Sequence, residues 1–522
     1  MTMLYSDTAT ATVAYYATAA LFTAITLIAS YRLFAHPLRA YPGPLAAKLT
    51  QFYTGRYVLI LRLHLVIWEL HRTYGPVIRL GPNALVFNTA TALRDIYQND
   101  RIRKSPNYQL VVKNNVYSVF HAIDPEIHRQ KRRMIGQVIS DRAMRSFEPV
   151  MAPEIDIFLK HIKQASQSST HVNLTPMAKF LSLDIAGQLT FGYGLNMQTS
   201  KSNRFMIQAI QAANFMGNLF LHMPFFSKIK YLEPITNRLF ADGRSNFLAL
   251  VDSISKERAA LDKNAKPDFY SYVADEIGAK GMENHEGVFW NEALFLLTAG
   301  GDTVATLLPA TFFYLVRNPR VYAKLVHEIR TTFAHGHEIQ GGPQLAGCVY
   351  LRACIDEALR MSPPGPTTLW RVQDPNDKQP LFIDGHLVPR GTTFGVNIYS
   401  LHHNEDYFPS PFEYRPERWL WSSNSIDEAA RKRALEAFTA FGVGSRQCAG
   451  KPMAYLEASL VLAKTIWYYD FESAPGELGQ VGGGRVGAKH GRDRPDEFQL
   501  HDMFVSLHDG PYLVFRSRRG AE

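Results

Sequence analysis

The stretch FGVGSRQCAG, residues 441–450, places a cysteine inside a glycine-rich loop and beside an arginine. The chain has only three cysteines, Cys348, Cys354 and Cys448. The residues after Cys448 read as a helix, so this cysteine is expected at or just before a helix N-terminus. Free N–H groups and the helix dipole stabilise a thiolate there and lower the pKa of the thiol. The loop therefore predicts a metal-ligating cysteine, whereas Cys348 and Cys354 read as small buried hydrophobic residues.

The glycines and the arginine of this loop indicate a large cofactor. Gly444 and Gly450 would let the backbone approach a flat group closely, and Arg446 would pair with an acidic group on it. The loop is similar to the haem-binding loop of the cytochromes P-450, in which Phe, Gly, Arg, Cys and Gly recur at these spacings. That resemblance implies that Cys448 is the axial thiolate ligand of a haem iron. It also implies that Phe441 lies against this ligand, and that Gly450 and Arg446 bind the cofactor, the arginine through a haem propionate.

A second pair of motifs lies upstream of the cysteine loop. In EALR, Glu357 and Arg360 share one helix face, a spacing that alone indicates only a solvated ion pair. The motif YRPERW follows at 414–419. In the P-450 family a Glu and an Arg of one helix lock with an Arg of this later motif, here Arg418. The resemblance thus implies a structural triad of Glu357, Arg360 and Arg418, with no catalytic role.

A third motif, LTAGGDTVAT at 297–306, lies within the apolar segment 290–316. Its apolar residues favour no single face, so a helix buried on all sides is expected, and a kinked core helix is the plain alternative. A buried Asp302 requires a partner or a function. The family's pattern at this place is matched by Ala299, Gly300, Asp302 and Thr303. The resemblance implies that Asp302 and Thr303 deliver protons for dioxygen cleavage, while Val304 departs from the Thr or Ser of many members.

Further cations would hold the cofactor. The family commonly has a Trp, three residues and an Arg on one helix, both contacting a haem propionate. His128 and Arg132 keep that spacing, but the histidine replaces the Trp, which leaves the role of His128 open. Arg371 stands where family members place another arginine that binds a propionate.

Composition and charge exclude several classes of protein. Of 522 residues, 46% are hydrophobic and 20% charged, values typical of a globular chain with a large core. The low, odd number of cysteines argues against a disulfide scaffold and for a reducing compartment. The net charge of +9 is spread without a long basic tract, so nucleic acid is not expected as a partner. An acidic protein partner or an anionic membrane surface fits this charge better.

The N-terminus predicts a membrane anchor. No charged residue lies between Asp7 and Arg32, and this apolar run is long enough for a spanning helix. A cleaved signal peptide is the competing interpretation, but no Lys or Arg precedes the run. Because cations follow it, the body is expected on the cytosolic side. We therefore expect residues 1–36 to be a single-pass anchor in the endoplasmic reticulum membrane and residues 37–522 to be the catalytic domain.

Beyond residue 50 the chain shows no internal repeat, and helical periodicity dominates, as in 320–333 and 351–361. Short strand-like pieces lie near both ends, at 77–81, 84–88 and 512–517. The expected fold is mainly α with small peripheral β-sheets. The resemblance makes this a cytochrome P-450 fold preceded by one N-terminal transmembrane helix.

The resemblance implies a haem-thiolate monooxygenase that contains haem b. It would insert one oxygen atom of dioxygen into a lipophilic small molecule, as microsomal fungal enzymes of secondary metabolism do. Electrons would come from NADPH through a separate reductase, since the chain has no P-loop and no dinucleotide-binding glycine motif. Arg433 and Lys451 are candidates for docking that acidic partner. A thiolate-haem isomerase or dehydratase and a non-enzymatic haem sensor are the alternatives. An isomerase would not need the acid–alcohol pair, and no signalling domain is present.

The substrate pocket is expected to have five walls. Its residues would come from 105–122, 205–226, Leu296, 367–370 and 504–507. The apolar run FMGNLFLHMPFF at 215–226 favours a lipophilic substrate that enters from the membrane.

Overall fold

The computed structural model describes residues 2–522 except 110–116, 139–140, 229–231, 280–284, 519, 521 and 522. Its long helices are α1 (Thr2–Ser30), α7 (Asp141–Gln167), α8 (Leu174–Phe191), α9 (Phe205–His222), α10 (Leu232–Ala259), α12 (His285–Arg317) and α18 (Lys451–Tyr468). Shorter helices are α2 (Leu45–Leu49), α3 (Phe52–Leu59), α4 (Leu63–Tyr74), α5 (Ala90–Tyr97), α6 (Pro125–Val138), α11 (Phe269–Ala279), α13 (Pro319–Thr332), α14 (Pro343–Ala346), α15 (Val349–Met361), α16 (Ile398–His402) and α17 (Ser425–Ala437). Brief helical turns are η1 (Tyr31–Ala35), η2 (Pro106–Gln109), η3 (Pro224–Lys228), η4 (Gly336–Glu338), η5 (Pro416–Trp419), η6 (Gly444–Arg446) and η7 (Gly476–Gln480).

The described strands form three small sheets. They are β1 (Val77–Gly81), β2 (Ala84–Phe87), β3 (Ile102–Lys104), β4 (His171–Asn173), β5 (Arg371–Gln373), β6 (Leu381–Ile383), β7 (His386–Val388), β8 (Thr393–Val396), β9 (Tyr469–Ser473) and β10 (Tyr512–Ser517). The largest sheet has the order β1-β2-β8-β5-β3, and the others have the orders β4-β10-β9 and β6-β7. In the largest sheet β3 and β5 pair antiparallel, so that Lys104 lies opposite Arg371. The predicted fold, mainly helical with small sheets, is confirmed.

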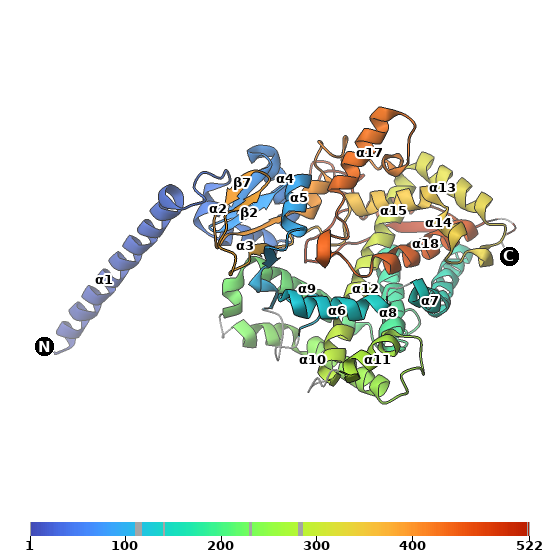
Figure 1. Cartoon of the computed structure of the whole chain (residues 1–522), viewed down its shortest axis with the longest axis horizontal. Helices are drawn as coiled ribbons and strands as arrows, with labels where there is room; N and C mark the ends of the chain where they lie inside the picture. Colours follow the sequence, from blue (N-terminus) through green and yellow to red (C-terminus); the bar gives the residue numbers. More distant parts are fainter. Residues whose placement is uncertain are drawn as a thin grey trace.

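Helix α12 crosses the middle of the body, and α8 packs along it (Figure 1). Side chains on several faces of α12 are fully buried, among them Leu297, Ala305 and Phe313. The predicted burial on all sides holds for residues 304–315, whereas the preceding part of the helix is only partly buried. Gly301 permits the close packing of these helices, because a Cβ there would lie 2.4 Å from the Leu183 side chain of α8. Gly300 instead lines the large cavity described below.

Helix α1 extends away from the body at the N-terminus (Figure 1). The stretch Thr12–Ala35 is apolar and long enough to cross a membrane, and none of it is buried. The stretch Gly287–Arg317 meets the same length and composition test, but it is 61% buried as the core helix α12. Helix α1 is therefore the candidate membrane span.

Candidate active site

The cysteine loop contains η6 and ends at the start of α18. Gly442 and Gly444 have φ angles of +68° and +77°, which favour glycine. A Cβ on Gly444 would lie 2.0 Å from the Tyr97 carbonyl oxygen of α5, so this glycine lets the loop pack on α5. The Cys448 N–H donates to the Phe441 carbonyl at 2.7 Å, which closes the loop. Cys448 stands three residues before Lys451, the first residue of α18.

The predicted lowering of the Cys448 pKa is wrong for this structure. The thiol surface is open to the cavity, but the protein around it removes it from bulk water, and this desolvation raises the pKa of the thiol more than the Gly450 and Lys451 N–H groups and the Arg132 charge lower it. The expected N–H donors at the start of α18 are present, but desolvation disfavours a thiolate that has no cation bound to it. A ligated metal cation would supply that missing charge.

A cavity of about 1390 Å³ adjoins the cysteine loop. This volume exceeds the roughly 300–1,000 Å³ of common small-molecule sites, so the cavity has room for a large planar group together with a second molecule. Phe441, Cys448 and Gly450 line it from the loop, and the segment of α12 that contains Ala299 and Thr303 also lines it. Each of the five predicted walls contributes residues to this cavity. Residues 110–116 of the first wall lie outside the described residues. Leu507 of the last wall lines a smaller, neighbouring chamber instead.

Cations gather at one part of this cavity. His128, Arg132, Arg446 and Lys104 line it, and Arg371 lies close enough to lower the pKa values of several of them. Burial, together with the Arg371 and Arg446 charges, holds the pKa of Lys104 well below its ordinary value. Burial and the nearby Arg371 charge lower the pKa of Arg446 to about 10. Buried cations that repel one another favour the binding of an anionic group.

His128 behaves differently from the arginines. Burial, together with the charges of Arg446, Lys104 and Arg132, lowers its pKa to about 3. Its imidazole is therefore neutral near pH 7 and can contribute a hydrogen bond rather than a charge. Arg446 donates to the carbonyl of Ile123 at 2.7 Å and also to that of Ala122, which fixes its guanidinium beside α6.

Lys104 is a site residue that the sequence did not reveal. It is 5% exposed, and its Nζ lies 3.8 Å from the centre of the Phe120 ring and 4.0 Å from that of Tyr108. No local spacing connects it with the cysteine loop more than 300 residues later. Lys104 joins the site because β3 pairs with β5, which places it opposite Arg371, and this pairing is not visible in the sequence.

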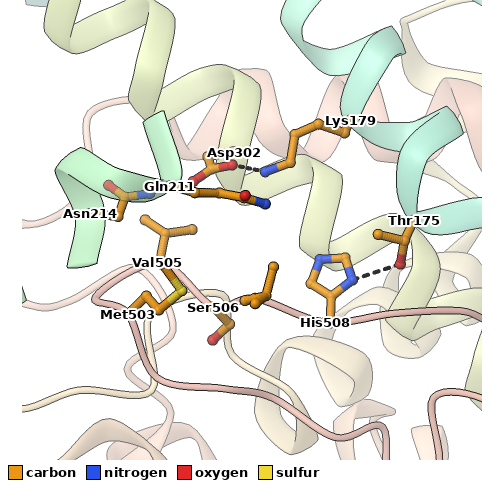
Figure 2. Close-up of a pocket in the computed structure, with 10 residues that line it drawn as sticks. Thr175, Lys179, Gln211, Asn214, Asp302, Met503, Val505, Ser506 and His508 are labelled. Carbon is orange, nitrogen blue, oxygen red and sulfur yellow. Dashed lines mark hydrogen bonds and ion pairs between the residues drawn. The ribbon is translucent and has the colours of Figure 1, made fainter. Parts of the chain in front are cut away.

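The predicted pair Asp302 and Thr303 faces two different spaces. Thr303 lines the large cavity, where its Oγ1 donates to the Ala299 carbonyl at 2.9 Å. Among the described residues, Asp302 lines only a smaller chamber, which α8, α9, α12 and residues 503–508 enclose (Figure 2). There it forms an ion pair with Lys179 and accepts a hydrogen bond from Asn214. The structure therefore places these neighbours on α12 without bringing their side chains into one site.

The predicted triad lies apart from the cavity. Glu357 is fully buried and accepts hydrogen bonds from Arg360 at 2.9 Å and from Arg418 at 3.0 Å. The indole of Trp419 and the N–H of Arg415 donate to the same carboxylate at 3.0 and 3.1 Å. Five N–H donors thus converge on one buried carboxylate: two from Arg360 of α15, two from Arg418 and Trp419 of η5, and one from Arg415, the residue before η5.

Comparison with known proteins identifies the class that this fold and site define. Residues 42–479 match the family model described as cytochrome P-450. The chain belongs to the cytochrome P-450 family. Three similar relatives are cytochrome P-450 monooxygenases: AKT7 of Alternaria alternata (33% identity), poxM of Penicillium oxalicum (34%) and apf7 of Gibberella fujikuroi (33%). The alignments cover 93%, 93% and 94% of this chain and 94%, 91% and 96% of the respective relatives. The chain is accordingly an enzyme, an oxidoreductase of the monooxygenase class.

The cofactor of this family is haem, and the residues of the site fit it. The Cys448 thiol opens onto a cavity large enough for a porphyrin. Gly450 places no side chain beside the sulfur, where an added Cβ would lie 4.0 Å from Sγ. The cluster of buried cations suits the carboxylates of haem propionates.

Proposed function

We propose that this protein is a haem-thiolate monooxygenase that inserts one oxygen atom of dioxygen into a C–H or C=C bond of a lipophilic small molecule. The observation that carries the proposal is that one large cavity is lined by the Cys448 thiol, by a cluster of cationic side chains and by long apolar walls. Haem b, when bound, supplies the reduction of dioxygen and the transfer of one oxygen atom.

The residues around the thiol would hold the cofactor. Cys448 would ligate the haem iron through its sulfur, and Phe441 and Gly450 line the cavity in the same loop. Bidentate pairing with a carboxylate suits guanidinium groups, so the propionates would be bound by the arginines. These are Arg132, Arg371 and Arg446, with Lys104 and the neutral His128 adding donors.

The walls of the cavity favour a neutral, lipophilic substrate. Phe120 stacks on Phe295 with ring centres 5.4 Å apart, and Phe504 meets Phe120 edge to face at 5.5 Å. His121 beside this cluster bonds to Ser118 at 2.8 Å, and burial lowers its pKa to about 3. A neutral imidazole in an aromatic wall orients one polar group of the substrate without selecting a charged one.

Thr303 would serve the proton delivery that the reaction requires. Its hydroxyl lies on the wall of the cavity and already orients as a donor along α12. The apolar lining excludes bulk water, so a proton must come from a side chain or a held water molecule. Asp302, which faces the smaller chamber on the other side of α12, would supply protons from behind Thr303.

The proposal also covers the membrane anchor and the source of electrons. Helix α1 would anchor the enzyme in the endoplasmic reticulum membrane, with residues 37–522 in the cytosol. NADPH-cytochrome P-450 reductase would donate electrons, and exposed Arg433 and Lys451 near the cysteine loop would meet its acidic surface. The fungal sources of the relatives support a tailoring step in secondary-metabolite biosynthesis.

The ligand assignment can be tested by spectroscopy. We expect the reduced carbon monoxide complex of the wild type to show the red-shifted band of thiolate haem, and Cys448→Ala to lose that band or the haem. Cys354→Ala is the matched control, because Cys354 is buried in the core and contributes only packing. With reductase, NADPH and dioxygen, only the wild type and the control should convert a host metabolite. An unaltered spectrum in Cys448→Ala would contradict the proposal.

A further inference from the structure

One wall of the large cavity is a short irregular segment, residues 118–121, which precedes α6 in the chain. All four residues of this wall segment line the cavity. Within the segment the His121 N–H donates to the Ser118 carbonyl at 3.0 Å, and the His121 ring bonds to the Ser118 hydroxyl at 2.8 Å. These bonds fix the local turn, but they do not fix where the turn lies relative to the helices around the cavity.

A carboxylate of the central helix α12 holds the wall segment from outside. Glu292 is fully buried, and its Oε2 accepts a hydrogen bond from the Val119 N–H at 3.0 Å. Its other oxygen, Oε1, accepts from the Lys131 Nζ of α6 at 2.7 Å. One side chain thus joins α12, α6 and the backbone of the wall segment.

The next turn of α12 holds the neighbouring wall residue. Phe295 follows Glu292 by three positions, so both side chains lie on one face of the helix. The Phe295 ring stacks on Phe120 with ring centres 5.4 Å apart and planes inclined by 13°. Lys104 of β3 also donates to the Phe120 carbonyl. Two consecutive wall residues, Val119 and Phe120, are therefore placed by side chains from distant parts of the chain.

The buried carboxylate is a costly way to join two helices. Burial raises the pKa of Glu292 in spite of the Lys131 charge and the Val119 N–H, which act in the opposite direction. A hydrophobic pair of similar volume often stabilises a protein core as well as a buried ion pair does. It would, however, leave the buried Val119 N–H without an acceptor. The hydrogen bond to the wall segment is thus what the carboxylate provides and a hydrophobic side chain would not.

We propose that Glu292 is a positioning residue for the substrate, whose carboxylate holds the wall segment so that Phe120 and His121 present a fixed surface to bulky ligands. A ligand that meets a fixed wall does not have to order it on binding, whereas a loosely held wall costs affinity. A ligand too small to reach the wall is unaffected. This inference rests on the proposed function, because it requires one cavity to hold haem and substrate together.

Two double variants of the full-length haem enzyme test the hydrogen bond. Glu292→Gln/Lys131→Met and Glu292→Met/Lys131→Met both remove the buried charges at similar volume, but only the first keeps an oxygen that can accept from the Val119 N–H. The probes are imidazole, a small iron ligand, and clotrimazole, a bulky aryl azole, titrated into the ferric enzyme by absorption spectroscopy. The dissociation constant of clotrimazole should stay near the wild-type value in the first variant and rise about three- to ten-fold in the second. That of imidazole should change in neither.

Equal ratios of the two dissociation constants in the two double variants would overturn the proposal, since a purely structural role of the pair would not distinguish glutamine from methionine through clotrimazole alone. Phe120→Ala tests the same wall from its own side. It should weaken clotrimazole binding and add little further loss in the Glu292→Met/Lys131→Met enzyme, because both changes act through one surface. Fully additive losses would also overturn the proposal.

The azole titrations need neither reductase nor dioxygen, so they are independent of turnover. If the wild type binds both azoles but oxidises no host metabolite with reductase, NADPH and dioxygen, the proposed function fails. The comparison of the two double variants then still decides whether Glu292 positions the wall segment.

Discussion

At Cys448, a single side chain is subject to two opposing electrostatic effects. The start of α18 and Arg132 favour the thiolate, but the protein around the cavity desolvates the thiol and raises its pKa overall, although its surface faces the cavity. The loop sequence indicated the first effect because capping is local, whereas burial depends on every element around the site. The same reasoning applies to Asp302, whose partner Lys179 lies on another helix and could not be read from spacing.

Thr303 gives a prediction at this scale. Thr303→Ala should keep haem binding, substrate binding and NADPH consumption, but should divert reducing equivalents into hydrogen peroxide. The reason is that removal of a positioned proton donor costs about a hundred- to ten-thousand-fold in the step that it assists. The ratio of product to peroxide per NADPH measures this effect. Thr306→Ala is a control on the same helix, because Thr306 is fully buried in the core. Undiminished product formation by Thr303→Ala would favour a reaction that needs no proton relay.

At the scale of elements, the Glu357 carboxylate joins α15 to η5. Burial alone would raise its pKa, but the Arg360 and Arg418 charges and the Arg415 N–H outweigh burial and hold the pKa below 4.5. The sequence could predict the pair on one helix face from its spacing. Family resemblance was needed for the third member, because 58 residues separate Arg418 from Arg360 (418 − 360).

Glu357→Gln should therefore destabilise the protein by about 3–5 kcal/mol at neutral pH, since it leaves two buried guanidinium groups without their anion. A carboxylate with a lowered pKa in the folded state contributes stability above its unfolded pKa, and this contribution is lost as pH falls through the folded pKa. The difference between wild type and variant should thus shrink as the pH falls below 4.5. Chemical unfolding across this range measures it. Glu428→Gln, which removes the carboxylate of a partly exposed surface pair with Arg431, should have a much smaller effect across this pH range.

At the scale of the whole molecule, a long exposed helix joins a helical body through η1. Arg79 of β1 is fully buried and donates to the Arg32 carbonyl at 3.0 Å, and the His36 ring bonds to Asn83 at 2.8 Å. The body therefore already contacts residues that immediately follow α1. A truncation after Ser30 preserves these contacts, whereas one after His36 removes them.

Removal of residues 1–30 should release much of the enzyme from microsomes and leave haem binding intact. A fraction should stay on membranes, because Phe52 and Phe225 are 60% and 59% exposed and belong to one aromatic surface through Phe226. Fractionation at high salt, followed by the carbon monoxide spectrum, measures both properties. The added variant Phe225→Ser should reduce the remaining fraction. A truncated enzyme that remains wholly membrane-bound would contradict the assignment of α1 as the anchor.

The sequence by itself determined the family, the helical class, the candidate span and the loop that carries Cys448, because each depends on residues that are near one another in the chain. Periodicity and short motifs are local properties, so they can be recognised in the sequence without knowledge of the fold. Only the tertiary structure decided that Lys104 lies opposite Arg371, through the pairing of β3 with β5. It also decided that Asp302 faces Lys179 of α8 while Thr303 faces the cavity. Such partners are set by the packing of distant elements, and burial then fixes their charges, so no local pattern contains them.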